Sequence, residues 1–103
     1  MRRVDAVFLI ASWTVASSRR GELLDALSAL IADIVAKQPG FVSAALYESS
    51  GASSVLARIQ MRTVEDRQRL EELPELRSAL HALRQIAESH AQRYTLVESF
   101  GDG

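Results

Sequence analysis

The chain has 103 residues, a net charge of −1 and no cysteine, and 48% of its residues are hydrophobic. This length and apolar content predict one domain around a single core, and the lack of cysteine excludes disulfides, thiolate nucleophiles and zinc–thiolate sites. Basic residues never run beyond a pair, so we expect no nucleic-acid surface. No stretch approaches about 20 apolar residues, so we expect no membrane span. We expect a cytoplasmic protein.

The first predicted element is a strand over residues 6–15, in which almost every residue is apolar or small. Such a run is typical of a strand that is covered on both faces. Side chains alternate along a strand, so one face holds Val7, Leu9, Ala11, Trp13 and Val15, and the other holds Phe8, Ile10, Ser12 and Thr14. Helices can cover one face, and something else must cover the other.

After a polar turn, leucines, isoleucines and a valine at three- and four-residue spacing predict a helix over residues 21–37. Pro39 and Gly40 end it. Two strands follow, over residues 41–48 and 54–62, and the small polar loop 49–53 joins them. Because this loop is too short for a crossover, the two strands are predicted to pair antiparallel.

Thr63 is predicted to be an N-cap, with Asp66 three residues further on. One helical region in two segments follows, a charged stretch over residues 64–73 and a second stretch over 75–87 with a break at Pro74 between them, and a last strand over 91–100 completes the pattern. We expect the tail 101–103 to fray. The order β-α-β-β-α-β predicts an α+β fold of the ferredoxin-like type, with an antiparallel sheet and both helices on one face.

The other face of this sheet also carries apolar and aromatic residues, and no third helix is left to cover it. An exposed apolar face of that size is typical of a surface that binds a partner. The sequence therefore predicts a homodimer that packs sheet against sheet, with a cavity under each sheet.

The whole chain from about Val7 to Phe100 resembles the antibiotic biosynthesis monooxygenase domain, a family of dimeric α/β barrels. The resemblance lies in IASWTV at residues 10–15, QPGF at 38–41, LYES at 46–49 and LPELRSAL at 73–80. It implies a dimeric ferredoxin-like fold and, in one branch, small oxygenases that oxidise anthrone-type polyketides with no metal, flavin or other cofactor. In that chemistry a phenolic polycycle loses a proton, and the resulting enolate gives an electron directly to dioxygen.

The match to the anthrone oxygenases is partial. Their strand-three asparagine and tryptophan correspond to Ala57 and Met61, their helix tyrosine corresponds to Arg67, and only their arginine is retained, as Arg77. The haem-degrading branch needs an asparagine where Trp13 stands, and the chain has no asparagine. The resemblance therefore argues against haem degradation.

The candidate catalytic residues are Arg77, Trp13 and His81. Arg77 would be a cation for an enolate or carboxylate, His81 one turn away a base, and Trp13 a flat wall for an aromatic ligand. Each has a plainer interpretation, since Trp13 can fill a core and the other two can form a solvated pair. The candidate substrate-binding residues are Leu9, Ala11, Tyr47, Ala57, Ile59, Met61 and Tyr94.

Three functions remain open at this point. The first is a cofactor-independent oxygenase of a polycyclic aromatic polyketide, and the second is a cyclase or isomerase of the same fold. The third is a binding or structural dimer with no activity. Arg58 and Gln60 lie in the middle of a predicted strand, where they need polar partners, a cavity with water, or a register change.

Overall fold

Four antiparallel strands form one sheet in the order β2-β3-β1-β4, in a computed structural model that describes residues 6–51 and 54–101. The strands are β1 (Val7–Val15), β2 (Phe41–Glu48), β3 (Ser54–Met61) and β4 (Ala87–Thr95). The helices are α1 (Arg20–Asp33), α2 (Val64–Glu71) and α3 (Pro74–Leu83), with the short 3-10 turns η1 (Ser17–Arg19) and η2 (Val35–Lys37).

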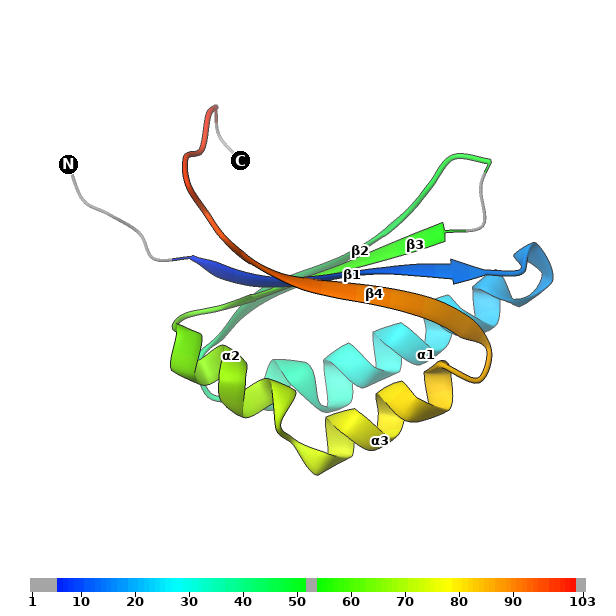
Figure 1. Cartoon of the computed structure of the whole chain (residues 1–103), viewed down its shortest axis with the longest axis horizontal. Helices are drawn as coiled ribbons and strands as arrows, with labels where there is room; N and C mark the ends of the chain where they lie inside the picture. The colour runs from blue at the N-terminus through cyan, green and yellow to red at the C-terminus, as the bar shows by residue number, and fades with distance from the viewer. Residues whose placement is uncertain (1–5, 52–53, 102–103) are drawn as a thin grey trace.

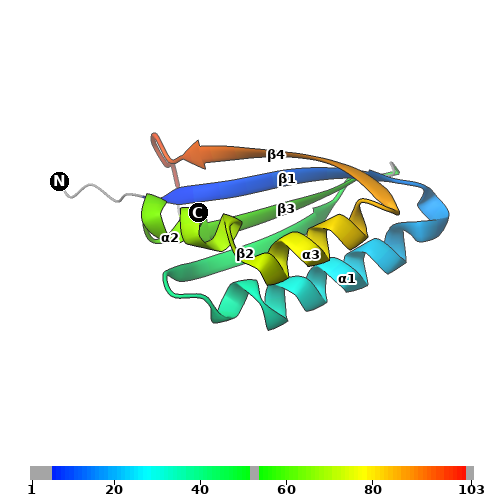
Figure 2. The ribbon, with the colours of Figure 1, turned by 60° about the horizontal axis from the view of Figure 1, so that its bottom comes forward.

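All three helices lie on the same face of the sheet (Figure 1). Figure 2 shows α1 and α3 side by side beneath the sheet, with α2 near the end where β1 begins. The predicted ferredoxin-like α+β fold is thus confirmed, with its second helical region split into two helices at Pro74.

The core lies between the sheet and the helices. Val7, Trp13 and Val15 of β1 are buried, and so is every second residue of β3, from Val55 to Met61. This alternation places the odd-numbered side chains of both strands against the helices, as expected for a strand with period two. Leu23 and Leu27 of α1 and Leu76 of α3 pack onto them.

Local signals in the sequence explain how the second helical region begins. The hydroxyl of Thr63 accepts a hydrogen bond of 3.0 Å from the backbone N–H of Asp66, which confirms the predicted N-cap. Pro74 occupies the first turn of α3, where its missing N–H removes no helical hydrogen bond.

The predicted ends of α1 and α3 and both predicted bounds of β4 were wrong. α1 ends at Asp33 and is followed by η2, whereas a continuous helix to residue 37 was expected. β4 begins at Ala87 and ends at Thr95, four or five residues before the predicted bounds at both ends. The reason is that α3 stops at Leu83, and Ala87 pairs with Val15 of β1. Part of the predicted loop 49–53 and of the tail 101–103 lies outside the described residues.

Gly40 adopts φ +84° just before β2, and a Cβ atom built there would lie 2.1 Å from Oδ2 of Asp66. We therefore expect Gly40→Ala to lower the free energy of unfolding by about 1–3 kcal/mol, because a side chain is strained at this φ and would also displace a buried carboxylate. Chemical denaturation measures this change. Gly21→Ala is the matched control, since an added Cβ there meets nothing within 4 Å and alanine favours a helix. Equal stability of the two variants would contradict this account.

Candidate active site

A cavity of about 70 Å³ lies between the sheet and the two long helices. Its floor comes from β1, β3 and β4, and its roof from α1 and α3. Apart from Arg84 and Ser89, every residue that lines it is apolar: Leu9, Ala11, Trp13, Leu27, Leu30, Ile31, Ala57, Ile59, Leu76, Leu80 and Ala91. The site can therefore hold an apolar or aromatic group away from bulk water.

In the part of the chain that the structure describes, Arg84 is the one residue with a formal charge that lines this cavity. It follows α3 directly, and its Nε lies 3.5 Å from the hydroxyl of Ser89 on β4, to which it donates a long hydrogen bond. The Arg84 side chain is exposed and also lines the open hollow next to the cavity, beside Val15 and Ala87. It thus stands where the cavity meets solvent.

Five of the residues predicted from the sequence come together in this cavity: Leu9, Ala11, Trp13, Ala57 and Ile59. They share the helix-facing side of β1 and β3. Trp13 is the largest of them and is only 2% exposed. Its indole is therefore part of the wall of the cavity and of the core at the same time.

The other predicted residues do not line the cavity. Arg77 is exposed and donates from Nε to the backbone oxygen of Glu71 at 3.1 Å, and it lines a separate polar cleft. His81 is exposed on α3, and Met61 is fully buried in the core. Tyr47 and Tyr94 are exposed, and the strand register puts both on the face of the sheet that points away from the helices.

Sequence reasoning did not assign Arg84, Ser89 or Ala91 to the site, nor the apolar roof residues Leu27, Leu30, Ile31, Leu76 and Leu80. A signal for Arg84 does exist, because Leu76, Leu80 and Arg84 follow one another at four-residue spacing and so share one helix face. An arginine at the end of an apolar stripe marks the point where the stripe reaches a polar partner or solvent. Ser89 could not be found in the same way, because the last strand was predicted to begin after it.

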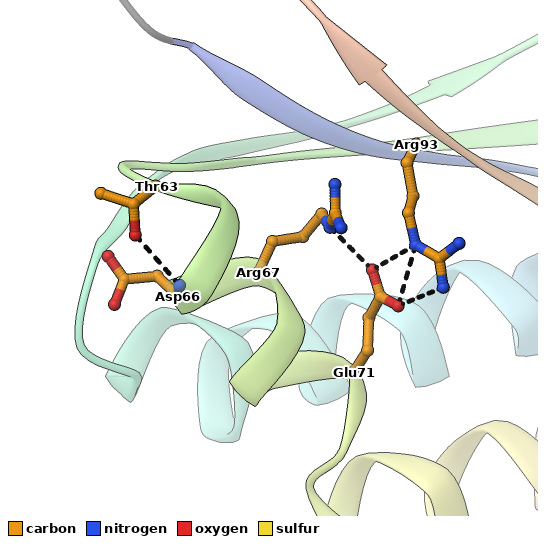
Figure 3. A network of polar contacts seen from close by, with 5 residues as sticks. All are labelled: Thr63, Asp66, Arg67, Glu71 and Arg93. Atoms are coloured by element: carbon orange, nitrogen blue, oxygen red, sulfur yellow. Dashed lines mark hydrogen bonds and ion pairs between the residues drawn. The ribbon is translucent and has the colours of Figure 1, made fainter.

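At the end of α2, Glu71 lies between two arginines (Figure 3). Arg93 of β4 contacts both carboxylate oxygens, with its NH2 group 2.7 Å from Oε1, and Arg67 lies 3.0 Å from Oε2 through Nε. The N–H of Arg67 does not point along this contact, which is an ion pair and not an aligned hydrogen bond. The hydrogen bonds from Arg93 lower the pKa of Glu71 below its ordinary value of 4.5, and the charge of Arg67 adds to this effect.

Because the pKa of Glu71 is depressed in the folded state, its ionised form contributes stability at pH values above about 4.5. That contribution is lost as the pH falls from there through the lower folded pKa. We expect Glu71→Gln to lower the melting temperature at neutral pH and to flatten its decline in acid. The exposed neighbour Glu72, changed to glutamine, is the control. Parallel acid profiles of the wild type and Glu71→Gln would contradict this expectation.

The sheet face that points away from the helices carries Phe8 and Ile10 of β1 and Leu56 of β3, all partly buried. On this outer face Arg58 lies over the ring of Phe8, 5.7 Å from its centre, and its Nε donates to the hydroxyl of Tyr47 at 3.4 Å. Gln60 accepts a hydrogen bond of 3.3 Å from Ser43. Arg58 and Gln60, the two mid-strand residues that needed polar partners, therefore find them on the outer face of the sheet and not in the core.

No helix in the described part of the chain is long and apolar enough to cross a membrane. Within residues 6–51 and 54–101, no group of three or more histidine, aspartate or glutamate side chains is arranged to hold a metal ion.

No family model and no curated protein matches this sequence. Solved structures do match it. SnoaB from Streptomyces nogalater, a cofactor-independent oxygenase, aligns with TM-score 0.86 and 21% identity over 96% of this chain and all of its own. A candidate antibiotic biosynthesis monooxygenase from Deinococcus radiodurans aligns with TM-score 0.81 and 16% identity over 94% of this chain and 98% of its own. The chain therefore has the fold of SnoaB and of the antibiotic biosynthesis monooxygenases.

Proposed function

We propose that this protein is a cofactor-independent monooxygenase of an aromatic, polyketide-type phenol. The observation that carries the proposal is the apolar cavity with one cation, Arg84, at its opening. The fold shared with SnoaB, a cofactor-independent oxygenase, supports it.

An apolar cavity suits this chemistry because the substrate itself supplies the electrons, so that the site needs no polar ligands for a cofactor. A phenol that loses its proton becomes an electron-rich enolate, which can reduce dioxygen without help from a redox cofactor. The apolar lining excludes water from the ring and strengthens every electrostatic contact at the site. Leu27 and Leu76, one from each roof helix, contribute to that lining.

Arg84 favours the anionic form of such a substrate. A guanidinium close to a phenolic oxygen stabilises the enolate over the neutral phenol, and the effect grows where water is scarce. Among the residues that the structure describes, those that line the cavity include no carboxylate and no imidazole. The phenolic proton therefore leaves toward solvent, past Arg84 and Ser89, and not to a base within the cavity.

The reaction then balances with dioxygen alone. One oxygen atom of dioxygen forms a bond to the electron-rich ring carbon of the enolate. The O–O bond breaks as that carbon loses its remaining hydrogen, which leaves a carbonyl oxygen on the ring and releases the second oxygen atom as water. The ring supplies all four electrons that reduce dioxygen.

An oxygen electrode tests this function directly. Purified protein treated with a chelator is mixed with an anthrone or with a hydroquinone, and oxygen uptake and the quinone product are measured against the uncatalysed rate. Uptake above that rate, with one oxygen atom from labelled dioxygen in the quinone, is the expected result. The uncatalysed rate with every phenol tested would exclude the function.

The small size of the cavity favours a second candidate, a protein that binds a small molecule without changing it. A volume of about 70 Å³ lies far below the roughly 300–1,000 Å³ of sites for drug-sized ligands. Ala57 and Met61 also stand where the anthrone oxygenases carry asparagine and tryptophan. Saturable binding of a phenol with no oxygen uptake would support this candidate.

The proposal includes a homodimer that forms through the outer face of the sheet. Phe8, Ile10 and Leu56 lie there with no helix over them (Figure 1), and an apolar surface of this kind gains stability when it is covered. We expect sedimentation at micromolar concentration to give twice the mass of the chain. Ile10→Glu should give a folded monomer, whereas Val64→Glu, on the exposed side of α2, should remain a dimer. A monomeric wild type would exclude this interface.

A further inference from the structure

Three alanines lie side by side on the floor of the cavity, one from each of three neighbouring strands. Ala11 of β1 pairs with Ala57 of β3 on one side and with Ala91 of β4 on the other. All three line the cavity. Neighbouring strands are about 4.8 Å apart, so this alanine row extends for roughly 10 Å across the sheet.

Larger side chains stand on both sides of the alanine row. Along β1, the next residues on the same face are Trp13 and Leu9, each about 6.7 Å away. Trp13 pairs with Val55, and Leu9 pairs with Ile59. The cavity is therefore a trough one residue wide that the register of the sheet itself creates, with Trp13 as its larger wall.

The volume of the trough limits what can enter. In protein interiors a cavity of about 150 Å³ holds one benzene ring, roughly twice the volume of about 70 Å³ found here. A single ring can be admitted if the exposed Arg84 swings outward, since within residues 6–51 and 54–101 its side chain is tied by one long contact of 3.5 Å, to Ser89. Three fused rings would also require Trp13 to leave the core, where it is 2% exposed.

We propose that the alanine row is the binding site of a single aromatic ring. The substrate is then a dihydroxybenzene and not a system of three fused rings. This inference rests on the proposed oxygenase function and narrows its substrate class. The ring lies over Ala11 and one phenolate oxygen faces Arg84. In the reaction, one ring C–H bond, both phenolic O–H bonds and the O–O bond break, and one C–O bond forms. Of the three hydrogens released, one ends on the new hydroxyl and two in water, so a hydroquinone and dioxygen give a hydroxyquinone and water.

Calorimetric titration without oxygen tests the ring size. Hydroquinone, naphthohydroquinone and an anthrone are titrated into the protein. Affinity ordinarily rises with the apolar area that a ligand buries. Because the trough is too small for fused rings, we expect the reverse order, with hydroquinone bound at least about tenfold more tightly than the anthrone. In Trp13→Phe this preference should shrink, because the wall of the trough recedes.

A matched pair of variants locates the ring. Ala57→Val adds two methyl groups inside the trough, and Ala32→Val adds the same groups on the exposed side of α1, away from both the cavity and the outer face of the sheet. Valine suits the strand position and is tolerated on an exposed helix face. Hydroquinone affinity should fall about tenfold or more in the first variant and stay unchanged in the second. This pair decides the question even if Trp13→Phe does not fold.

Three results would overturn the proposal: an anthrone bound as tightly as hydroquinone, Ala57→Val with unchanged affinity, or no ring bound at all. Measuring oxygen uptake distinguishes failure of the single-ring proposal from failure of the proposed oxygenase function. Ring-size selectivity without oxygen uptake supports the alanine row as a binding site and excludes the oxygenase. Oxygen uptake with an anthrone but without ring-size selectivity supports the oxygenase and excludes the single-ring binding site.

Discussion

Replacing Arg84 with alanine is expected to lower kcat/KM for oxygen uptake by a factor of about 100 to 1,000, which corresponds to roughly 2.7–4 kcal/mol of transition-state stabilisation. The reason is that Arg84 is the one cation among the described residues that line the apolar cavity, and its loss would remove the charge partner that they offer an enolate. Stability should change little, by about 0.3–1 kcal/mol, because the side chain is exposed at the end of α3. Steady-state kinetics and thermal melting measure the two effects separately.

Two further variants show whether the charge at this position causes the effect. Arg84→Lys keeps the charge but loses the planar fork, so it should recover part of the lost rate. Arg77→Ala tests the arginine that the sequence favoured, and it should keep its rate because Arg77 lines a different cleft. A large loss in Arg77→Ala, with normal kinetics in Arg84→Ala, would show that the sequence-based assignment is right and that the cavity is not the site.

Replacing Trp13 with alanine is expected to lower the free energy of unfolding by about 3–5 kcal/mol. Trp13 is 2% exposed and packs in the core between the sheet and the helices, so its removal leaves a void that the neighbouring side chains fill only in part. Denaturant titration with circular dichroism measures the change. Ligand affinity should fall too, because one wall of the cavity is lost.

Trp13→Phe separates packing from any specific role of the indole. Phenylalanine keeps a flat apolar ring at this position, so most of the stability should remain. If Trp13→Ala is as stable as Trp13→Phe, the side chain does not support the core in the way that its burial indicates.

The sequence predicted the sheet well where periodicity is strong. Phe41–Glu48 matched the predicted bounds, and the two faces of β1 were assigned correctly. The start of β4 was missed because Ile86 and Ala87 continue the apolar stripe of α3. Only the pairing of Ala87 with Val15, a contact between residues far apart in the chain, makes this segment a strand. Local spacing carries no information on such a contact.

The candidate site was predicted in part for the same physical reason. Leu9, Ala11 and Trp13 were found because alternation along one strand fixes which side chains share a face. Arg77 was chosen by resemblance, and its side chain instead turns to the backbone of Glu71. Which helix residue reaches the cavity depends on how α3 is rotated over the sheet, and sequence spacing alone left several residues of that helix as candidates.

The position of Trp13 also gives the protein an optical property. It is the only tryptophan of the chain and forms a wall of the cavity, whereas the only two tyrosines, Tyr47 and Tyr94, lie on the opposite face of the sheet. Selectively excited indole fluorescence therefore reports from the cavity without any label. Because tyrosine and indole absorb in the same range, the two tyrosines report on the other face through energy transfer to that indole, across the thickness of a single sheet.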